Sequence, residues 1–151
     1  DVASAAAALT GLGMATYTGV LLGATAIPIW AKHATLLPAQ FGASSLASAA
    51  AALELIGHRE RALHRIGWVS AGAETVLHRQ GPSSTTARLA GAFAGPIPLA
   101  TRLLFGRSRR ARQAAAVSTL LGSLLTRLAW IEAGRASARG DAAGSRQPVG
   151  K

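Results

Sequence analysis

Stretches without charge alternate with short basic stretches along the whole chain. No charged residue occurs in residues 2–31, and residues 35–56 contain a single one, Glu54. A helix needs about 20 predominantly apolar residues to cross the hydrocarbon of a bilayer. Residues 6–29 and 35–56 are therefore each predicted to form a transmembrane helix. Pro38 falls in the first turn of the second helix, where its missing N–H removes no helical hydrogen bond.

The second half of the chain predicts less regular membrane segments. Residues 62–79 contain Glu74 and predict either a tilted crossing or a helix that lies at the membrane interface. Residues 87–105 carry Gly-Pro-Ile-Pro at 95–98, and two prolines this close bend or break a helix. Such a break requires neighbouring protein groups to satisfy the freed carbonyls. With a last segment over residues 111–133, the pattern predicts an all-α polytopic transmembrane helix bundle with four or five membrane-embedded helices.

The two ends of the chain differ from this bundle. Residues 136–151 are polar and are predicted to be a disordered tail, which leaves residues 1–135 as the transmembrane bundle. The chain starts with Asp1 and enters apolar sequence without the basic region of a secretory signal. We therefore expect the bundle to be a partial domain of a longer protein.

Arginine dominates the charge, and its positions narrow the class of protein. The formal net charge is +10, and arginine supplies 14 of the 16 Lys and Arg residues. Charges that separate apolar blocks are typical of a membrane protein with basic loops. A soluble nucleic-acid binder, the alternative, carries a basic face instead. With five crossings, the loops around 57–65 and 106–112 share one side of the membrane. Loops 30–33 and 78–88 share the other side with the tail, and because both sides are basic the orientation is not predicted.

Small and polar residues in the first two segments predict close helix packing. Hydrophobic attraction does not draw helices together in lipid, so small residues that let backbones approach hold such bundles together. Gly19 and Gly23 lie four residues apart in the first segment, and the second carries one stripe of small and polar residues: Gln40, Ser44, Ser48 and Ala52. We expect both segments to be inner helices. The alternative is that the alanine content only reflects the base composition of the genome.

Two motifs in the first third of the chain resemble the NrfD-like family of polysulfide reductase membrane subunits. In that family a helix with a Tyr-x-Gly-x-x-Leu core ends in Pro-x-Trp, and a Leu-Pro-Ala start opens the next helix. The resemblance is specific over residues 15–56, looser over residues 109–138, and weak between them. The matching residues are Tyr17, Gly19, Leu22, Pro28, Trp30, Leu37, Pro38 and Ala39.

The resemblance implies a membrane subunit of a respiratory oxidoreductase. Family members are all-α integral proteins of the bacterial inner membrane that bind quinone near one surface. They dock an iron–sulfur subunit, which exchanges electrons with a molybdopterin catalytic subunit, and they carry no haem or metal themselves. This chain is shorter than family members and is expected to match only their later half. It contains no cysteine, which excludes thiolate metal sites.

Six residues are candidates for contact with quinone or for a proton path, and each also has a structural interpretation. A quinone needs hydrogen-bonding groups at its carbonyls and a nearby route for protons, and ionisable residues inside a membrane are often functional. Each candidate can instead bond a neighbouring helix or reach headgroup water. The candidates are Tyr17, Thr18, Gln40, Glu54, Glu74 and Arg127.

The densest basic loop is a candidate contact surface. Its arginines are predicted to meet either anionic lipid or a partner subunit, and they are Arg107, Arg109, Arg110 and Arg112. His58, Glu60 and His64 have no further ligand nearby and do not predict a metal site.

The sequence therefore favours a quinone-interacting integral membrane subunit that anchors the iron–sulfur and molybdopterin subunits and exchanges electrons with the quinone pool. The chain alone would be non-catalytic, and no nucleic acid is expected as a partner. One rival is a transporter or channel fragment, with the break at 95–98 as a discontinuous helix at a substrate site. The other rival is the soluble basic nucleic-acid binder.

Overall fold

The computed structural model describes residues 1–106 and 108–144, and within them the chain is all-α, as predicted. A 3-10 turn at His78–Gln80 follows the fourth helix. The α-helices are α1 (Val2–Gly23), α2 (Pro28–Lys32), α3 (Leu36–Ile56), α4 (Arg61–Leu77), α5 (Thr85–Ala94), α6 (Pro96–Phe105) and α7 (Arg109–Gly144).

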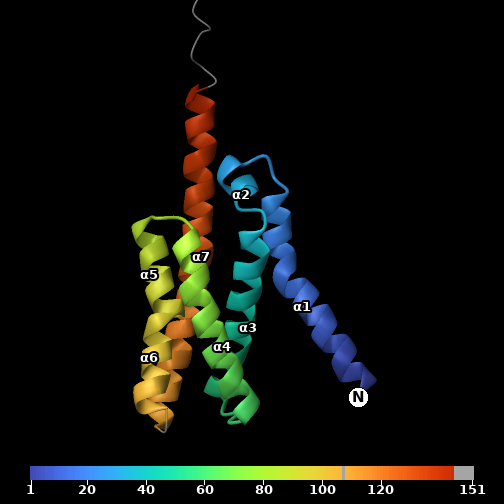
Figure 1. The fold of residues 1–151 in the computed structure, drawn as a ribbon, viewed down its shortest axis with the longest axis vertical. Coiled ribbons are helices and arrows are strands. Elements are labelled where there is room, and N and C mark those ends of the chain that lie inside the picture. Colours follow the sequence, from blue (N-terminus) through green and yellow to red (C-terminus); the bar gives the residue numbers. More distant parts are fainter. Residues whose placement is uncertain (107, 145–151) are drawn as a thin grey trace, which may run out of the picture.

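The helices run up and down the long axis of the molecule (Figure 1). α1 rises, α3 descends, α4 rises, α5 and α6 descend as one broken rod, and α7 rises past the end of the bundle. The α3–α4 loop and the α6–α7 turn therefore lie at one end, named here the basic end. The α1–α3 connection and the α4–α5 loop lie at the opposite end beside α2, named here the α2 end. This arrangement agrees with the pairing of loops predicted for five crossings.

Three helices are long and apolar enough to cross a membrane by their length and composition. They are Val2–Gly23, Leu36–Ile56 and the Arg109–Gly140 part of α7. α4 has 17 residues and α5 and α6 have 10 each, so none of these three reaches that standard alone. The predicted second segment agrees closely with α3.

The first predicted segment is interrupted at its end. α1 stops at Gly23, and a separate short helix starts at Pro28. Ile27 has an extended backbone with φ −78° and ψ 117°, because the ring of a following proline disfavours the helical conformation. The expectation of one helix over residues 6–29 is therefore wrong at its C-terminal end.

Small residues bring the helices into backbone contact, as predicted. A Cβ added to Gly19 would lie 2.6 Å from backbone atoms of Leu37 and Pro38, and one added to Gly23 would lie 2.9 Å from Ala34. Ser44 Oγ donates a 2.8 Å hydrogen bond to Ser123 Oγ and joins α3 to α7. α3 is an inner helix of the bundle, as predicted, because it packs against α1, α4 and α7.

α1 lies at the edge of the bundle, so the expectation that it is an inner helix is wrong here. Gly19 is its buried residue, and the N-terminal half diverges from α3 (Figure 1). A Cβ added to Gly11 or Gly13 would meet nothing within 4 Å. Most of α1 therefore presents its surface to the surroundings rather than to this chain.

The rod formed by α5 and α6 breaks at Gly95, where the sequence predicted a break. Pro96 starts α6, and Ser118 of α7 donates a 2.9 Å hydrogen bond to the carbonyl of Phe93. The break is packed rather than hollow, since a Cβ on Gly95 would lie within contact of the Thr75 side chain. A packed break gives no support to a substrate site there.

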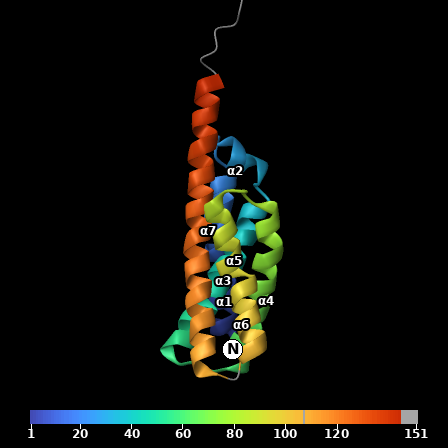
Figure 2. The same cartoon turned by 90° about the vertical axis from the view of Figure 1, so that its left-hand side faces the viewer.

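α7 is longer than the predicted last segment. It continues to Gly144, so residues 136–144 extend the helix where a disordered tail was expected. Figure 2 shows this extension standing beyond the rest of the bundle. Residues 145–151 lie outside the described part of the chain.

Candidate functional site

Gln40 lies in a buried cluster of aromatic residues at the α2 end. Its side chain is buried, and its Oε1 accepts a 3.1 Å hydrogen bond from Trp130 Nε1. Trp30 Nε1 donates a 2.9 Å hydrogen bond to the carbonyl of Trp130. The ring of His33 stands edge-on to Trp130 at 5.4 Å between centroids. Of the two roles predicted for Gln40, this geometry favours the bond to a neighbouring helix.

Glu74 lies beside His78 in the interior of the bundle. His78 Nδ1 is 3.0 Å from Glu74 Oε2 and 2.9 Å from the Glu74 carbonyl oxygen. His78 Nε2 is 3.0 Å from Thr126 Oγ1, whose proton goes to the carbonyl of Gly122 at 2.8 Å. Both ring nitrogens of His78 therefore face acceptors.

His78 and Glu74 lie close enough to exchange a proton. A neutral imidazole donates from one nitrogen and accepts at the other. With Nε2 donating to Thr126, a hydrogen bond between Nδ1 and the carboxyl group needs a proton from either His78 or Glu74. Both carboxylate oxygens of Glu74 and the nearby Ser70 Oγ are buried and have no hydrogen-bond partner among the described residues, so the contact between Glu74 Oε2 and His78 Nδ1 is a close approach rather than a hydrogen bond. Buried polar atoms without partners are rare, and of these two residues only Glu74 is ionisable.

A cavity joins Gln40 to His78. It holds about 10 Å³ and lies among Gln40, His78, Thr126 and Trp130. A water molecule needs a cavity of roughly this size or slightly more, so a quinone ring does not fit. Gln40 and His78 thus face one small cavity near the α2 end, and Glu74 is connected to it through its contact with His78.

Glu54 forms a buried ion pair with Arg102. The two terminal nitrogens of Arg102 donate to the two carboxylate oxygens of Glu54 at 2.8 and 2.6 Å. Gly67 on α4 makes room for the guanidinium group, because a Cβ there would lie 2.7 Å from Arg102 Cζ. Glu54 was expected either to reach headgroup water or to act in a proton path, and instead it joins α3 to α6.

Tyr17 and Thr18 are exposed on α1 and do not reach either buried cluster. Tyr17 is 57% exposed. Thr10 and Thr16 donate to carbonyls of their own helix, whereas no hydrogen bond is found for the Tyr17 and Thr18 hydroxyls within residues 1–106 and 108–144. These two hydroxyl groups therefore remain free to bind a molecule outside this chain.

Arg127 meets another helix, which is one of its two predicted roles. It is half-buried, and its guanidinium lies 5.3 Å from the centroid of the Phe41 ring on α3. Its terminal nitrogen is 3.5 Å from Ser45 Oγ. Arg127 thus stabilises the contact between α7 and α3.

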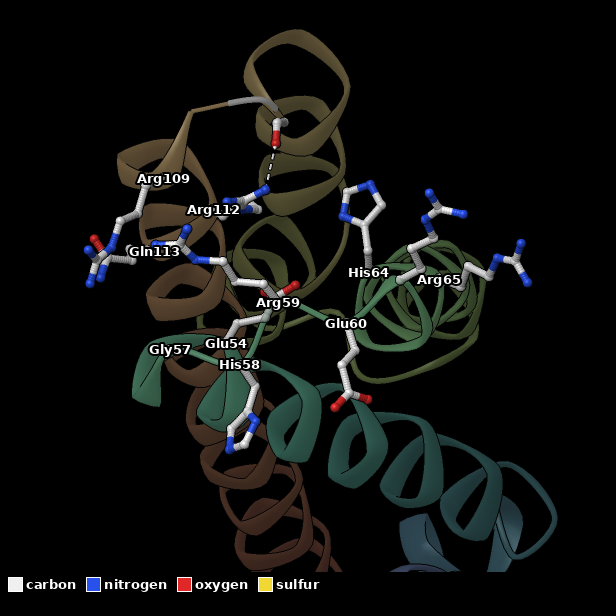
Figure 3. A pocket seen from close by; sticks show the side chains of 12 residues that line it. Glu54, Gly57, His58, Arg59, Glu60, His64, Arg65, Arg109, Arg112 and Gln113 are labelled. Atoms are coloured by element: carbon white, nitrogen blue, oxygen red, sulfur yellow. Dashed lines mark hydrogen bonds between the residues drawn. The ribbon is translucent and has the colours of Figure 1, made fainter.

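A pocket of about 390 Å³ opens at the basic end (Figure 3). Arg109 and Arg112 line it, Arg110 does not, and Arg107 lies outside the described residues. The remaining lining comes from the end of α3, the α3–α4 loop, the start of α4, the α6–α7 turn and the first turns of α7. The full lining is Glu54, Gly57, His58, Arg59, Glu60, Arg61, His64, Arg65, Gly106, Arg109, Arg112 and Gln113.

The clusters around Arg102, His78 and Trp130 were not among the predicted sites. Each joins residues far apart in the sequence, and the sequence gives only indirect signals for them. Such signals are Glu54, the single charge in residues 35–56, and Arg102, an arginine within residues 87–105. The described residues contain no group of three or more His, Cys, Asp or Glu that could hold a metal ion.

Comparison with known proteins gives one match. A family model described as polysulfide reductase, of the NrfD type, matches residues 2–139. The matched region includes the middle of the chain, where the motifs were weak, so the similarity extends over nearly all of the sequence. Comparisons with curated proteins and with solved structures gave no match.

Proposed function

Because the chain belongs to the NrfD-like polysulfide reductase family, we propose that it is a quinone-interacting membrane subunit of a respiratory oxidoreductase in the bacterial inner membrane. In this role it anchors an iron–sulfur subunit and a molybdopterin catalytic subunit and exchanges electrons with the quinone pool. The family match over residues 2–139 carries the proposal. The family match and the three candidate spans favour an integral membrane protein over a soluble nucleic-acid binder.

The bundle crosses the membrane five times in this proposal. α4 and the rod of α5 and α6 run alongside α3 and α7 between the same two ends (Figure 1). The buried charged residues of these helices, Glu74 and Arg102, point into the bundle and meet partners there, whereas Arg65 and Arg88 lie exposed near the starts of α4 and α5. Inward-facing, paired charges are the expected arrangement for ionisable residues at membrane depth.

Tyr17 and Thr18 are the residues proposed to contact the quinone. A hydroxyl group without a partner is costly in hydrocarbon, so two such groups on a lipid-facing helix favour a polar ligand there. The other candidates are already engaged inside the bundle. A quinone carbonyl is an acceptor that suits both hydroxyl donors.

The pair of Glu74 and His78 is proposed to hold a proton during quinone chemistry. Glu74 lies three residues before the end of α4, and Tyr17 lies six residues before the end of α1. Both helix ends lie at the α2 end of the bundle (Figure 1). Reduction or oxidation of a quinone moves protons together with electrons, so a proton-holding pair at the same end supports the proposal.

The test measures quinone binding to the purified chain in lipid nanodiscs. Quenching of tryptophan fluorescence as quinone is added reports the binding. We expect saturable quenching, and we expect Tyr17→Phe with Thr18→Val to weaken it by about fivefold for each hydrogen bond lost. Thr10→Val is the matched control, because the Thr10 hydroxyl already bonds the Ala6 carbonyl at 2.8 Å. Equal affinity in the double variant and the wild type would contradict the assignment of these two residues. Absence of saturable quenching would contradict the quinone role itself.

A further inference from the structure

The pocket at the basic end holds an excess of positive charge. In Figure 3 Arg59 reaches towards Arg112 and Gln113, and Arg109 lies on the outer rim. Arg112 also donates a 3.5 Å hydrogen bond to the carbonyl of Gly106. Glu60 points away from this group. The carboxylate of Glu54 is already bound by Arg102, which does not line the pocket. In the described part of the chain, Arg102 is the arginine that forms an ion pair.

The backbone adds to the positive potential of the pocket. α4 and α7 both begin at this end, and neither has an acidic residue in its first turn. Glu60 precedes α4 as its N-cap residue but makes no capping hydrogen bond with its side chain. The start of a helix carries a partial positive charge and is stabilised by nearby anions. Arg61 and Arg109 occupy the first helical positions instead. Like charges are therefore gathered in one cavity, which an anion would stabilise.

The surface beside the pocket is apolar. A second hollow shares His64 and Gly106 with the pocket and is lined by the last turn of α6. Its lining includes Leu103, Leu104 and Phe105, whose exposed fractions are 62%, 73% and 61%. A basic cavity that continues into an exposed apolar hollow matches an amphiphilic molecule with a negatively charged head.

We propose that this pocket binds the phosphate headgroup of an anionic phospholipid, with its acyl chains along Leu103, Leu104 and Phe105. A guanidinium group binds phosphate through paired, charge-assisted hydrogen bonds. The position of the pocket at the end of the transmembrane helices is where headgroups lie. The sequence suggested lipid contact only for the loop 107–112, whereas the structure adds Arg59 of the α3–α4 loop and a defined cavity. The proposal does not rest on the redox role.

The test compares lipids that differ only in the headgroup. Native mass spectrometry of the detergent-solubilised chain measures bound phosphatidylglycerol and phosphatidylcholine with identical acyl chains. We expect a preference for phosphatidylglycerol, reduced in Arg59→Gln with Arg112→Gln by about fivefold for each arginine. Arg88→Gln with Arg110→Gln removes the same charge from exposed residues outside the pocket and should keep the preference.

Three outcomes would overturn the proposal. The first is equal binding of the two lipids, and the second is an equal loss in the control variant, which would show a general effect of net charge. The third is displacement of phosphatidylglycerol by inorganic phosphate, which would identify a site for a free anion. Circular dichroism of both double variants checks that the helices remain folded.

Discussion

Arg102 on α6 binds both carboxylate oxygens of Glu54 on α3, at 2.8 and 2.6 Å, from a position 48 residues away in the sequence. Both side chains are buried, and Gly67 on α4 leaves the space that the guanidinium occupies. The pair therefore fixes the relative positions of three helices. It also neutralises two charges that would otherwise lie unpaired inside the bundle.

Removal of one partner of this pair should destabilise the protein more than removal of both. A buried charge left alone costs about 3 kcal/mol, whereas two apolar residues of similar size in its place are nearly neutral. We expect Glu54→Leu to lower the free energy of unfolding by about that amount. The double variant Glu54→Leu with Arg102→Met should recover most of the loss. Unfolding by sodium dodecyl sulfate measures all the variants, and additive losses would show that the two residues are not coupled.

Gly19→Ala should separate α1 from α3. The added Cβ would lie 2.6 Å from the backbone of Leu37, which cannot move without shifting the start of α3. Overpacking of this kind costs about 1 to 3 kcal/mol. Gly13→Ala is the matched control on the same helix, because its Cβ meets nothing within 4 Å. Disulfide cross-linking between cysteines introduced on α1 and α3 reports the contact, and unchanged cross-linking in Gly19→Ala would refute this packing.

Gln40→Leu distinguishes a structural role of Gln40 from a role in quinone binding. Loss of the amide leaves the Trp130 Nε1–H buried without an acceptor, which costs about 1 to 3 kcal/mol. We expect a lower free energy of unfolding together with unchanged quinone affinity in the nanodisc assay. A stable variant with weakened quinone binding would instead place Gln40 at the quinone.

Glu74→Gln tests the proton-holding pair. An amide cannot take up and release the proton that the carboxyl group shares with His78, and general acid–base groups contribute about a hundredfold or more to rates. Quinol-dependent electron transfer by the assembled oxidoreductase should therefore slow by about a hundredfold, the lower end of that range.

Ser70→Ala is the control for that measurement. Ser70 is buried one helical turn from Glu74, and its hydroxyl has no partner among the described residues, so its removal should leave electron transfer unchanged. A wild-type rate in folded Glu74→Gln would exclude a proton role for the pair.

The elements that follow from local sequence were the ones that could be predicted. The near absence of charge in residues 35–56 predicted the bounds of α3 to within one residue. The glycine and prolines of residues 95–98 predicted the break between α5 and α6. The loop pairing followed from the number of crossings alone. Gly19 and Gly23 indicated a close helix contact because few other features of a membrane helix need a residue without a side chain.

The features that could not be predicted depend on partners far away in the sequence. Nothing near Glu54 identifies Arg102, and nothing near Gln40 identifies Trp130. The edge position of α1 likewise depends on which helices pack against it and does not follow from its composition. Its sequence is as rich in small residues as that of α3. The extension of α7 past residue 135 was missed because a polar stretch was interpreted as disordered, although its alanine and arginine residues favour helix.

α7 is longer than a membrane crossing requires. A helix of 36 residues is about 54 Å long, whereas the hydrocarbon is about 30 Å thick, so a large part of α7 stands in water. The Ser137 hydroxyl accepts a hydrogen bond from the Ile29 amide at 3.3 Å, and Gly134 lies against the ring of Trp30. These two contacts hold α2 against α7. The position of Trp30 is therefore tied to the part of α7 that extends beyond the rest of the bundle.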